Sequence, residues 1–332
     1  MAETYPWSWY ADPAVLAVEQ ERIFRSAWHY VAHADRLPGP AGYFACMTGG
    51  LPVVVTSDRD GERRAFLNVC RHRGAQIVEG EGRRETLQCP YHAWTYGLDG
   101  ELQKAPRADR EAEFDAAGLS LVPLRLEAWG PFLFVNADAA APPLAETLGE
   151  LELPFEPADL VFRERVDYSL AGNWKIAVEN YLECYHCPVA HPGFSRLVDV
   201  DPEAWRLDGE GPVWSQYGRA RQGGGSCEFH LVWPALKVNV YPGFANLSIG
   251  PVWPEGPEGT SGFLDYFFGP DVDDATAREL IEFDDQVGRE DTALVESVQR
   301  GVRTGLVSAG RLLPESERLI AGFQRRVTAA IT

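Results

Sequence analysis

Two short segments of the chain each combine one cysteine with one histidine at close spacing. Cys70 stands two residues before His72, and Cys89 stands three residues before His92. Sixteen residues separate the two segments. Two thiolates and two imidazoles are the ligands of a [2Fe–2S] cluster in which histidines hold one of the two irons, and such a cluster transfers single electrons. The two segments therefore predict an electron-transfer cluster.

The same four side chains could instead hold a structural zinc ion, because two cysteines and two histidines also satisfy tetrahedral Zn²⁺. Zinc sites usually pair two cysteines in one loop, whereas each loop here is mixed. Each also carries turn-forming residues beside its ligands, Arg73-Gly74 in the first and Pro90 in the second. We therefore favour the iron–sulfur interpretation and keep zinc as the alternative.

The two loops are similar to those of a known family. The runs Cys70-Arg71-His72-Arg73-Gly74 and Cys89-Pro90-Tyr91-His92-Ala93-Trp94 resemble the cluster loops of the Rieske non-haem iron oxygenases, in particular of their catalytic α subunit. The resemblance extends from Trp28-His29-Tyr30-Val31 to Val298-Gln299-Arg300-Gly301. It implies an oxidoreductase that incorporates oxygen from O₂, with a Rieske [2Fe–2S] cluster and a mononuclear Fe(II).

The same resemblance implies an α+β protein, with a small all-β Rieske domain and a helix-grip-like α+β catalytic domain built on an antiparallel sheet. We expect an N-terminal helical segment over residues 1–37 that packs on the catalytic domain, the Rieske domain over residues 38–145, and the catalytic domain over residues 146–332. The first boundary is placed at Pro38-Gly39-Pro40, which ends the helical spacing. The second follows the small, proline-rich stretch 137–143.

A second group of metal-binding residue types lies about a hundred residues further on. Up to Cys187 the segment that begins at Asn173 is predicted to be a helix, so Glu183 and His186, three residues apart, share one face. His191 would point away from His186 on an unbroken helix. Two prolines, at positions 188 and 192, interrupt the helix and allow His191 to fold back beside His186.

Two histidines need a carboxylate to complete the facial triad that leaves positions open for O₂ on Fe(II). The stretch from about residue 275 to residue 302 predicts a long amphipathic helix, and Asp291 falls inside its apolar stripe. The stripe is formed by Leu280, Val287, Leu294 and Val298. A carboxylate on a buried face is costly unless it is paired or binds a metal. Asp284 lies on nearly the same side, so geometry alone does not separate the two; the resemblance of Glu290-Asp291 to the family's ligand segment favours Asp291.

The resemblance also gives Glu183 a role in electron transfer. In the related enzymes an acidic residue three before the first histidine links the cluster of one subunit to the iron of its neighbour, which implies a head-to-tail homotrimer. Most ring-hydroxylating members have aspartate there, and glutamate resembles the subset acting on small quaternary ammonium compounds, such as the carnitine and glycine betaine oxygenases. Cys184 and Cys187 flank His186 and are predicted to be packing residues rather than ligands.

Composition restricts the partners and the compartment. The formal net charge of −19 disfavours nucleic acid and anionic membrane surfaces, which would repel the chain. Six cysteines, four of them in the motif segments, argue against a disulfide framework and favour the cytoplasm. No signal-peptide pattern opens the sequence, and no run is apolar and long enough to span a bilayer. We expect a cytoplasmic protein.

The electrons are expected to come from a separate protein. Gly80-Glu81-Gly82 approaches a dinucleotide fingerprint, but the following residues lack the further glycine that the motif needs. The family resemblance therefore implies an external, flavin-containing NAD(P)H reductase, with or without a ferredoxin.

The expected reaction is hydroxylation or oxidative demethylation of a small organic substrate. The sequence contains 10 tryptophans and 12 tyrosines, which could build an aromatic cage, and together with Glu183 and the acidic charge this favours a quaternary ammonium compound. An apolar pocket would instead accept an aromatic compound for ring hydroxylation or O-demethylation. In a third alternative the chain is a Rieske electron carrier or redox sensor, although a carrier needs only the cluster domain.

Overall fold

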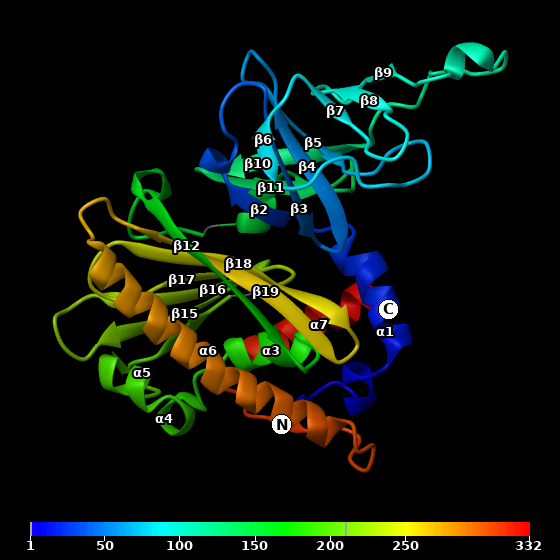
Figure 1. Ribbon diagram of the computed structural model, residues 1–332. Coiled ribbons are helices and arrows are strands. Elements are labelled where there is room, and N and C mark those ends of the chain that lie inside the picture. Colours follow the sequence, from blue (N-terminus) through cyan, green and yellow to red (C-terminus); the bar gives the residue numbers. More distant parts are fainter. Residues whose placement is uncertain (1, 150, 210) are drawn as a thin grey trace. The chain divides into compact units, whose positions relative to one another are not determined.

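The computed structural model describes residues 2–149, 151–209 and 211–332. The chain divides into two compact units, one of residues 25–144 and one that combines residues 1–24 with residues 145–332 (Figure 1). The described strands pair antiparallel throughout. The α+β class and the antiparallel sheets expected from the sequence are therefore confirmed.

The unit of residues 25–144 consists mainly of β-strands. Seven strands form one sheet in the order β2-β11-β10-β5-β4-β3-β6, and three form a second sheet in the order β7-β8-β9. The elements are β2 (His29–His33), η3 (Ala34–Arg36), β3 (Gly42–Thr48), β4 (Leu51–Ser57), β5 (Arg63–Leu67), β6 (Glu81–Arg83), β7 (Thr86–Gln88), β8 (Thr95–Gly97), β9 (Leu102–Lys104), η4 (Ala108–Arg110), β10 (Pro123–Trp129) and β11 (Phe132–Asn136).

The large sheet of this unit is covered on both faces. Side chains alternate along β4, so Val54 enters one core while Val53 and Val55 enter the other. The core on the Val54 side also contains Cys70 and Cys89. Both cluster loops are therefore fixed by burial against the sheet.

The predicted N-terminal helical segment is shorter than expected. Helix η1 (Trp7–Tyr10), α1 (Pro13–Glu19) and the π-helix η2 (Gln20–Phe24) are helical and lie in the unit with residues 145–332. Residues 29–33 instead form β2, which pairs with β11, so the helical prediction was wrong for this run; the helical turn η3 that follows belongs to the unit of residues 25–144. The physical reason is that this run is rich in aromatic and β-branched residues and is buried on consecutive positions, which suits a strand covered on both faces.

The second unit is built on an eight-stranded sheet in the order β12-β19-β18-β17-β16-β15-β13, with β14 paired to β15. Its strands are β12 (Val161–Leu170), β13 (Val198–Asp199), β14 (Arg206–Asp208), β15 (Val213–Ala220), β16 (Ser226–Val232), β17 (Leu236–Val240), β18 (Asn246–Gly256) and β19 (Gly259–Phe268), and a separate pair joins β1 (Ala2–Glu3) to β20 (Arg311–Leu312). Besides η1, α1 and η2, its helices are η5 (Pro157–Asp159), α3 (Trp174–Tyr181), α4 (Cys187–Ala190), α5 (Pro192–Leu197), α6 (Asp274–Val302) and α7 (Arg318–Ile331), and α2 (Leu144–Leu148) spans the division between the units.

Helices α3 and α6 position the candidate metal-binding residues of this unit. Asn173 caps α3 by accepting from the backbone N–H of Lys175, and Asp273 caps α6 by accepting from that of Thr276. Helix α3 contacts β18, β19 and α6, and α6 contacts β12, so both helices pack on the sheet (Figure 1).

The long helix expected from about residue 275 to residue 302 is present as α6, but its buried stripe differs from the prediction. The buried positions of α6 are Ala277, Ile281, Asp284, Val295, Gln299 and Val302. Leu294 and Val298, which the sequence pattern placed on the buried stripe, are 36% and 48% exposed. Asp291 therefore lies at the edge of the buried face, with 30% of its side chain exposed. Among the helices of the described segments, none combines the length and apolarity that crossing a membrane requires.

Candidate functional site

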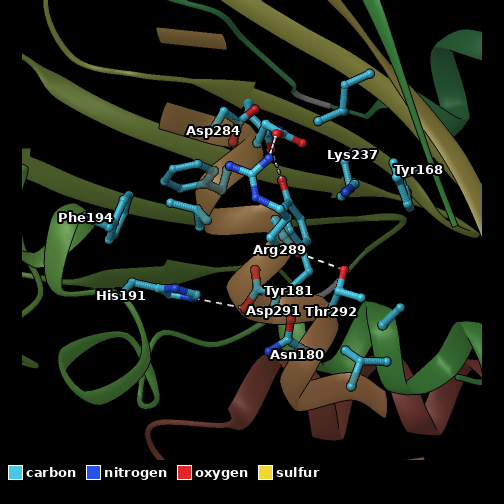
Figure 2. Close-up of a pocket in the computed structure, with 18 of the residues that line it drawn as sticks. Tyr168, Asn180, Tyr181, His191, Phe194, Lys237, Asp284, Arg289, Asp291 and Thr292 are labelled. Carbon is cyan, nitrogen blue, oxygen red and sulfur yellow. Dashed lines mark hydrogen bonds and ion pairs between the residues drawn. The ribbon is translucent and has the colours of Figure 1, made fainter. Parts of the chain in front are cut away.

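Three side chains from two segments meet at one point of the second unit. The Nε2 atoms of His186 and His191 lie 3.1 Å apart. Asp291 Oδ1 lies 2.9 Å from His191 Nε2 and 3.4 Å from His186 Nε2, and Figure 2 shows His191 facing Asp291. Ligand atoms about 2.1 Å from one ion and at right angles lie about 3 Å apart. The three residues thus have the spacing of ligands around a single metal ion.

The turn between the two histidines differs from the prediction. Helix α3 ends at Tyr181 rather than near Cys187, because the carboxylate of Glu183 accepts from the backbone N–H groups of Tyr185 and His186 and replaces the helical acceptors. Pro188 and Pro192 then stand in the first turns of two short helices, α4 and α5. His191 is the residue between those helices, which places it beside His186 as expected.

The Nδ1 atom of each histidine contacts a carboxylate on the side of the ring away from Nε2. His186 Nδ1 contacts Glu183 Oε1, and His191 Nδ1 donates to Glu290 Oε2 at 2.8 Å. With both Nδ1 atoms donating, the neutral rings keep their lone pairs on Nε2, directed at Asp291. Glu290 was not predicted as a site residue, although its position next to Asp291 on α6 was a usable signal.

The lone pairs of this triad need a cation between them. Burial alone would lower the pKa of His186, but the hydrogen bonds and charges of Asp291 and Glu183 raise it to about 9. Burial would raise the pKa of Asp291, but the two histidines lower it to about 2. A proton shared between the rings would supply this positive charge. A divalent metal ion would supply it more effectively, because it can bind all three donor atoms at once.

Asp284 occupies a different environment from Asp291. It is buried, and its carboxylate accepts from the hydroxyl of Tyr241 at 2.6 Å and from that of Tyr266 at 2.8 Å. Burial raises the pKa of Asp284. The structure therefore separates the two candidates that the helical pattern left open, and it brings Asp291 to the histidines.

The cluster loops form a second site in the unit of residues 25–144. Cys70 and Cys89 are buried, whereas His72 and His92 are exposed and their ring centroids lie 4.6 Å apart. The hydroxyl of Tyr96 lies 3.3 Å from Cys70 Sγ. Burial, with the neighbouring Cys70 thiol, raises the pKa of the Cys89 thiol. Buried sulfurs and surface imidazoles suit a cluster with one iron inside and one at the edge.

The same loops do not have the spacing of a mononuclear zinc site. Around one zinc ion the four ligand atoms would lie within about 4 Å of one another. Across residues 2–149, 151–209 and 211–332, the triad of His186, His191 and Asp291 is the group of three or more such side chains whose ligand atoms all lie within 4.8 Å. The loop ligands are more widely spread, which fits two irons bridged by sulfides.

Cys184 and Cys187 are buried in a hydrophobic cluster, as predicted, but they are also bonded to each other. They form a disulfide with a Cα–Cα distance of 5.0 Å, and both line the cavity next to His186. The spacing of three residues, together with the turn that follows α3, brings the two thiols within bonding reach. The sequence argued against a disulfide framework and did not predict this single bond.

A cavity of about 350 Å³ opens at the triad, between the sheet and helices α3 and α6. A volume of this size suits a small organic ligand. The walls include the triad, Glu183 and several aromatic side chains, among them Tyr168, Tyr181, Phe194, Trp205, Phe229, Tyr241 and Tyr266.

An electron-transfer module and a catalytic module with a metal triad and a cavity together define a Rieske-type oxygenase. The family models agree: residues 27–123 match the Rieske [2Fe-2S] domain, and residues 157–332 match the ring hydroxylating alpha subunit (catalytic domain). The chain belongs to the Rieske non-haem iron oxygenases, as its resemblance to them indicated. It is an oxidoreductase whose cofactors are a Rieske cluster and a mononuclear iron, with O₂ as co-substrate.

Similar proteins cover almost the whole chain. The carnitine monooxygenase oxygenase subunit of Acinetobacter pittii is 36% identical, over 96% of this chain and 90% of that protein. The chloroplastic choline monooxygenase of Spinacia oleracea is 33% identical, over 97% and 77%. A crystal structure of a quaternary ammonium Rieske monooxygenase in complex with its substrate L-carnitine superposes with a TM-score of 0.87 at 34% identity, covering 100% of this chain and 96% of that one. Naphthalene 1,2-dioxygenase from Rhodococcus, 20% identical with a TM-score of 0.83, shares the fold.

Proposed function

We propose that the chain is the oxygenase component of a system that hydroxylates or oxidatively demethylates a small quaternary ammonium compound. In this proposal His186, His191 and Asp291 hold the mononuclear iron. The Rieske cluster is held by Cys70, His72, Cys89 and His92. The observation that carries the proposal is that three converging lone-pair donors and a wall of aromatic rings lie in one cavity.

The protein's own part in the chemistry is to hold and orient. Two histidines and one carboxylate leave coordination positions on Fe(II) open for O₂. Glu183 and Glu290 fix the two imidazole rings, so that both Nε2 atoms stay directed at one point. The aromatic wall keeps water from the substrate side of that point.

The aromatic wall has the composition that binds methylated ammonium groups. The ring centroid of Phe229 lies 5.8 Å from that of Phe194, 6.3 Å from that of Trp205 and 5.5 Å from that of Tyr241. All four side chains line the cavity. Electron-rich ring faces attract a quaternary ammonium ion that can form no hydrogen bond. Relatives named for carnitine and for choline, both quaternary ammonium compounds, support the same substrate class.

The electron path is proposed to cross a subunit boundary at Glu183. Its Oε1 contacts His186 Nδ1, so the carboxylate is already joined to one ligand and would need a cluster histidine on the other side. Tyr185 and Val189, beside it, are 63% and 89% exposed, and Tyr91 on the cluster loop is 58% exposed. Exposed apolar side chains at both places support docking between copies of the chain, which we propose to form a head-to-tail homotrimer. Inter-subunit electron transfer has been described for a similar quaternary ammonium monooxygenase.

The electron donor is proposed to be a separate flavin-containing NAD(P)H reductase, with or without a ferredoxin. The exposed edges of His72 and His92 support this, because a docked partner could approach the cluster directly. A cytoplasmic location, where reduced nicotinamide cofactors are supplied, belongs to the same proposal.

Substrate-dependent oxygen uptake tests the proposal. The holoenzyme, a Rieske reductase and NADH are incubated with L-carnitine, choline, glycine betaine and a set of aromatic acids, and products are identified by mass spectrometry. We expect oxygenated or dealkylated products from the quaternary compounds. Products from the aromatic acids alone would favour ring hydroxylation or O-demethylation, and reduction of the cluster without any product would favour an electron carrier.

A further inference from the structure

The cavity contains a lysine whose charge the proposed function does not use. Lys237 and Asn239 lie at alternate positions on β17 and so on one face of the sheet, and Tyr241 follows directly after the strand ends at Val240; all three residues line the cavity. The chain has three lysines, at positions 104, 175 and 237. Lys175 is buried in an ion pair with Glu19, and Lys104 is exposed on β9. Lys237 alone of the three lines this cavity.

The ammonium of Lys237 is held in place by aromatic rings rather than by an anion. Its Nζ lies 4.6 Å from the ring centroid of Tyr168 and 5.8 Å from that of Tyr181. Tyr168 is itself fixed, because its hydroxyl donates to the carbonyl of Pro251 at 3.0 Å. Ring faces position an ammonium, but they leave its three N–H donors without strong acceptors.

No carboxylate of the described residues forms an ion pair with Lys237. Asp284 also lines the cavity, but burial raises its pKa despite the charge of Lys237, and both oxygens of its carboxylate accept from tyrosine hydroxyls. Arg289 also lines the cavity, but it is paired with Asp285 on α6 and 62% of its side chain is exposed. A half-buried ammonium without a counterion is a binding site for an anionic group.

Lys237 lies on the opposite side of the cavity from Phe194 and His191 (Figure 2). Figure 2 shows Lys237 and Tyr168 on one side, with Phe194 and His191 on the other. At the rise of an extended strand, the four-residue step from Lys237 on β17 to Tyr241, one residue past its end, corresponds to about 13 Å between Cα atoms. The cavity therefore offers an aromatic surface beside the metal triad and a cation at a distance from it.

We propose that Lys237 binds a substrate carboxylate, so that the substrate is a zwitterion with a quaternary ammonium at one end and a carboxylate at the other. This rests on the proposed function and narrows it. The ammonium head lies against Phe194, Trp205, Phe229 and Tyr241, next to the metal triad, and the carboxylate receives charge-assisted hydrogen bonds from Nζ. A purely cationic substrate such as choline gains nothing at Lys237 and is repelled by its charge.

A pair of matched ligands tests this inference by direct binding. Calorimetry on the anaerobic holoenzyme compares γ-butyrobetaine and L-carnitine with their methyl esters, which keep the ammonium and lose the carboxylate charge. We expect the acids to bind about 10- to 100-fold more tightly than the esters, the range of a charge-assisted hydrogen bond. Lys237→Met should abolish that preference, and Lys237→Arg should keep most of it. Lys104→Met removes the same charge from the other unit and should leave the preference unchanged.

The outcomes separate the inference from the function on which it rests. If the wild-type protein binds the esters or choline as tightly as the acids, or if Lys237→Met weakens acid and ester equally, the carboxylate site is wrong and the quaternary ammonium function stands. If only aromatic acids bind and turn over, the quaternary ammonium function is wrong. In that case the affinities of the wild type and of Lys237→Met for an aromatic acid and for its ester decide whether Lys237 binds the carboxylate. If Lys237→Met weakens binding of the acid and of the ester equally, the inference is wrong.

Discussion

Replacing Glu290 should weaken the metal site without touching a metal ligand. Glu290 accepts from His191 Nδ1 at 2.8 Å, and Gln286 donates to its other oxygen at 3.0 Å, so its position is fixed from both sides. Loss of an outer carboxylate of this kind lowers metal affinity about 10- to 100-fold, or about 1.4 to 2.7 kcal/mol. Glu290→Gln keeps an acceptor for the Nδ1 proton and loses only the charge, so we expect a loss of metal affinity of about 10-fold. Glu290→Ala loses both the acceptor and the charge, so we expect a loss of about 100-fold.

The assay is an anaerobic titration of the protein, freed of its mononuclear metal, with Fe(II) or Co(II) against a competing chelator. The visible spectrum of the cluster serves as an internal control, because Glu290 lies in the other unit. Glu282→Gln removes a carboxylate from the exposed face of the same helix and should bind metal like the wild type. Equal affinities for Glu290→Ala and Glu282→Gln would refute the role of Glu290 in holding His191.

Three further results are expected. Burial raises the pKa of Glu179 from 4.5 to about 7, so its contribution to the unfolding free energy is complete below about pH 4.5 and falls by about 3 kcal/mol as the pH rises through 7. Glu179→Gln should therefore flatten the pH dependence of the unfolding free energy between about pH 5 and 8. An unchanged pH profile would contradict this prediction. Lys175→Met should lower the unfolding free energy, measured with denaturant, by about 3–5 kcal/mol because it leaves Glu19 buried without its partner. Adding Glu19→Gln should recover part of that loss. Additive effects of the two substitutions would exclude coupling between Lys175 and Glu19. The hydroxyl of Tyr96 contacts Cys70 Sγ, and a hydrogen bond there would favour the more negative, reduced form of the cluster. Tyr96→Phe removes this contact, so a redox titration should give a lower reduction potential. A potential equal to or above that of the wild type would rule out this role of Tyr96.

The residues proposed to hold the cluster and the iron could be picked out because their signals are local or nearly so. The two cysteine–histidine pairs lie in short loops, and burial of both cysteines against one core follows once the strands around them pair. His186 and His191 are five residues apart, and the prolines between and after them limit the possible turns. Asp291 lies about a hundred residues away, and only its place on a long helix together with the family resemblance singled it out.

Other features depend on packing that sequence spacing does not encode. Leu294 and Val298 are apolar yet exposed, so apolar periodicity placed the buried face of α6 about one residue from its true position. The end of α3 depends on Glu183 accepting from backbone N–H groups, a contact that competes with the helix and leaves no periodic trace. The roles of Glu290 and Lys237 depend on tertiary contacts that their sequence positions do not reveal. Glu290 contacts His191, and Lys237 lines the cavity.

The most direct test of the whole account is the iron content of anaerobically purified protein together with its EPR spectrum before and after dithionite reduction. The account predicts about three irons per chain and a reduced Rieske signal. It also predicts that His191→Ala loses one iron and all oxygenation while keeping that signal. Zinc in place of iron, or substrate turnover that survives His191→Ala, would contradict it.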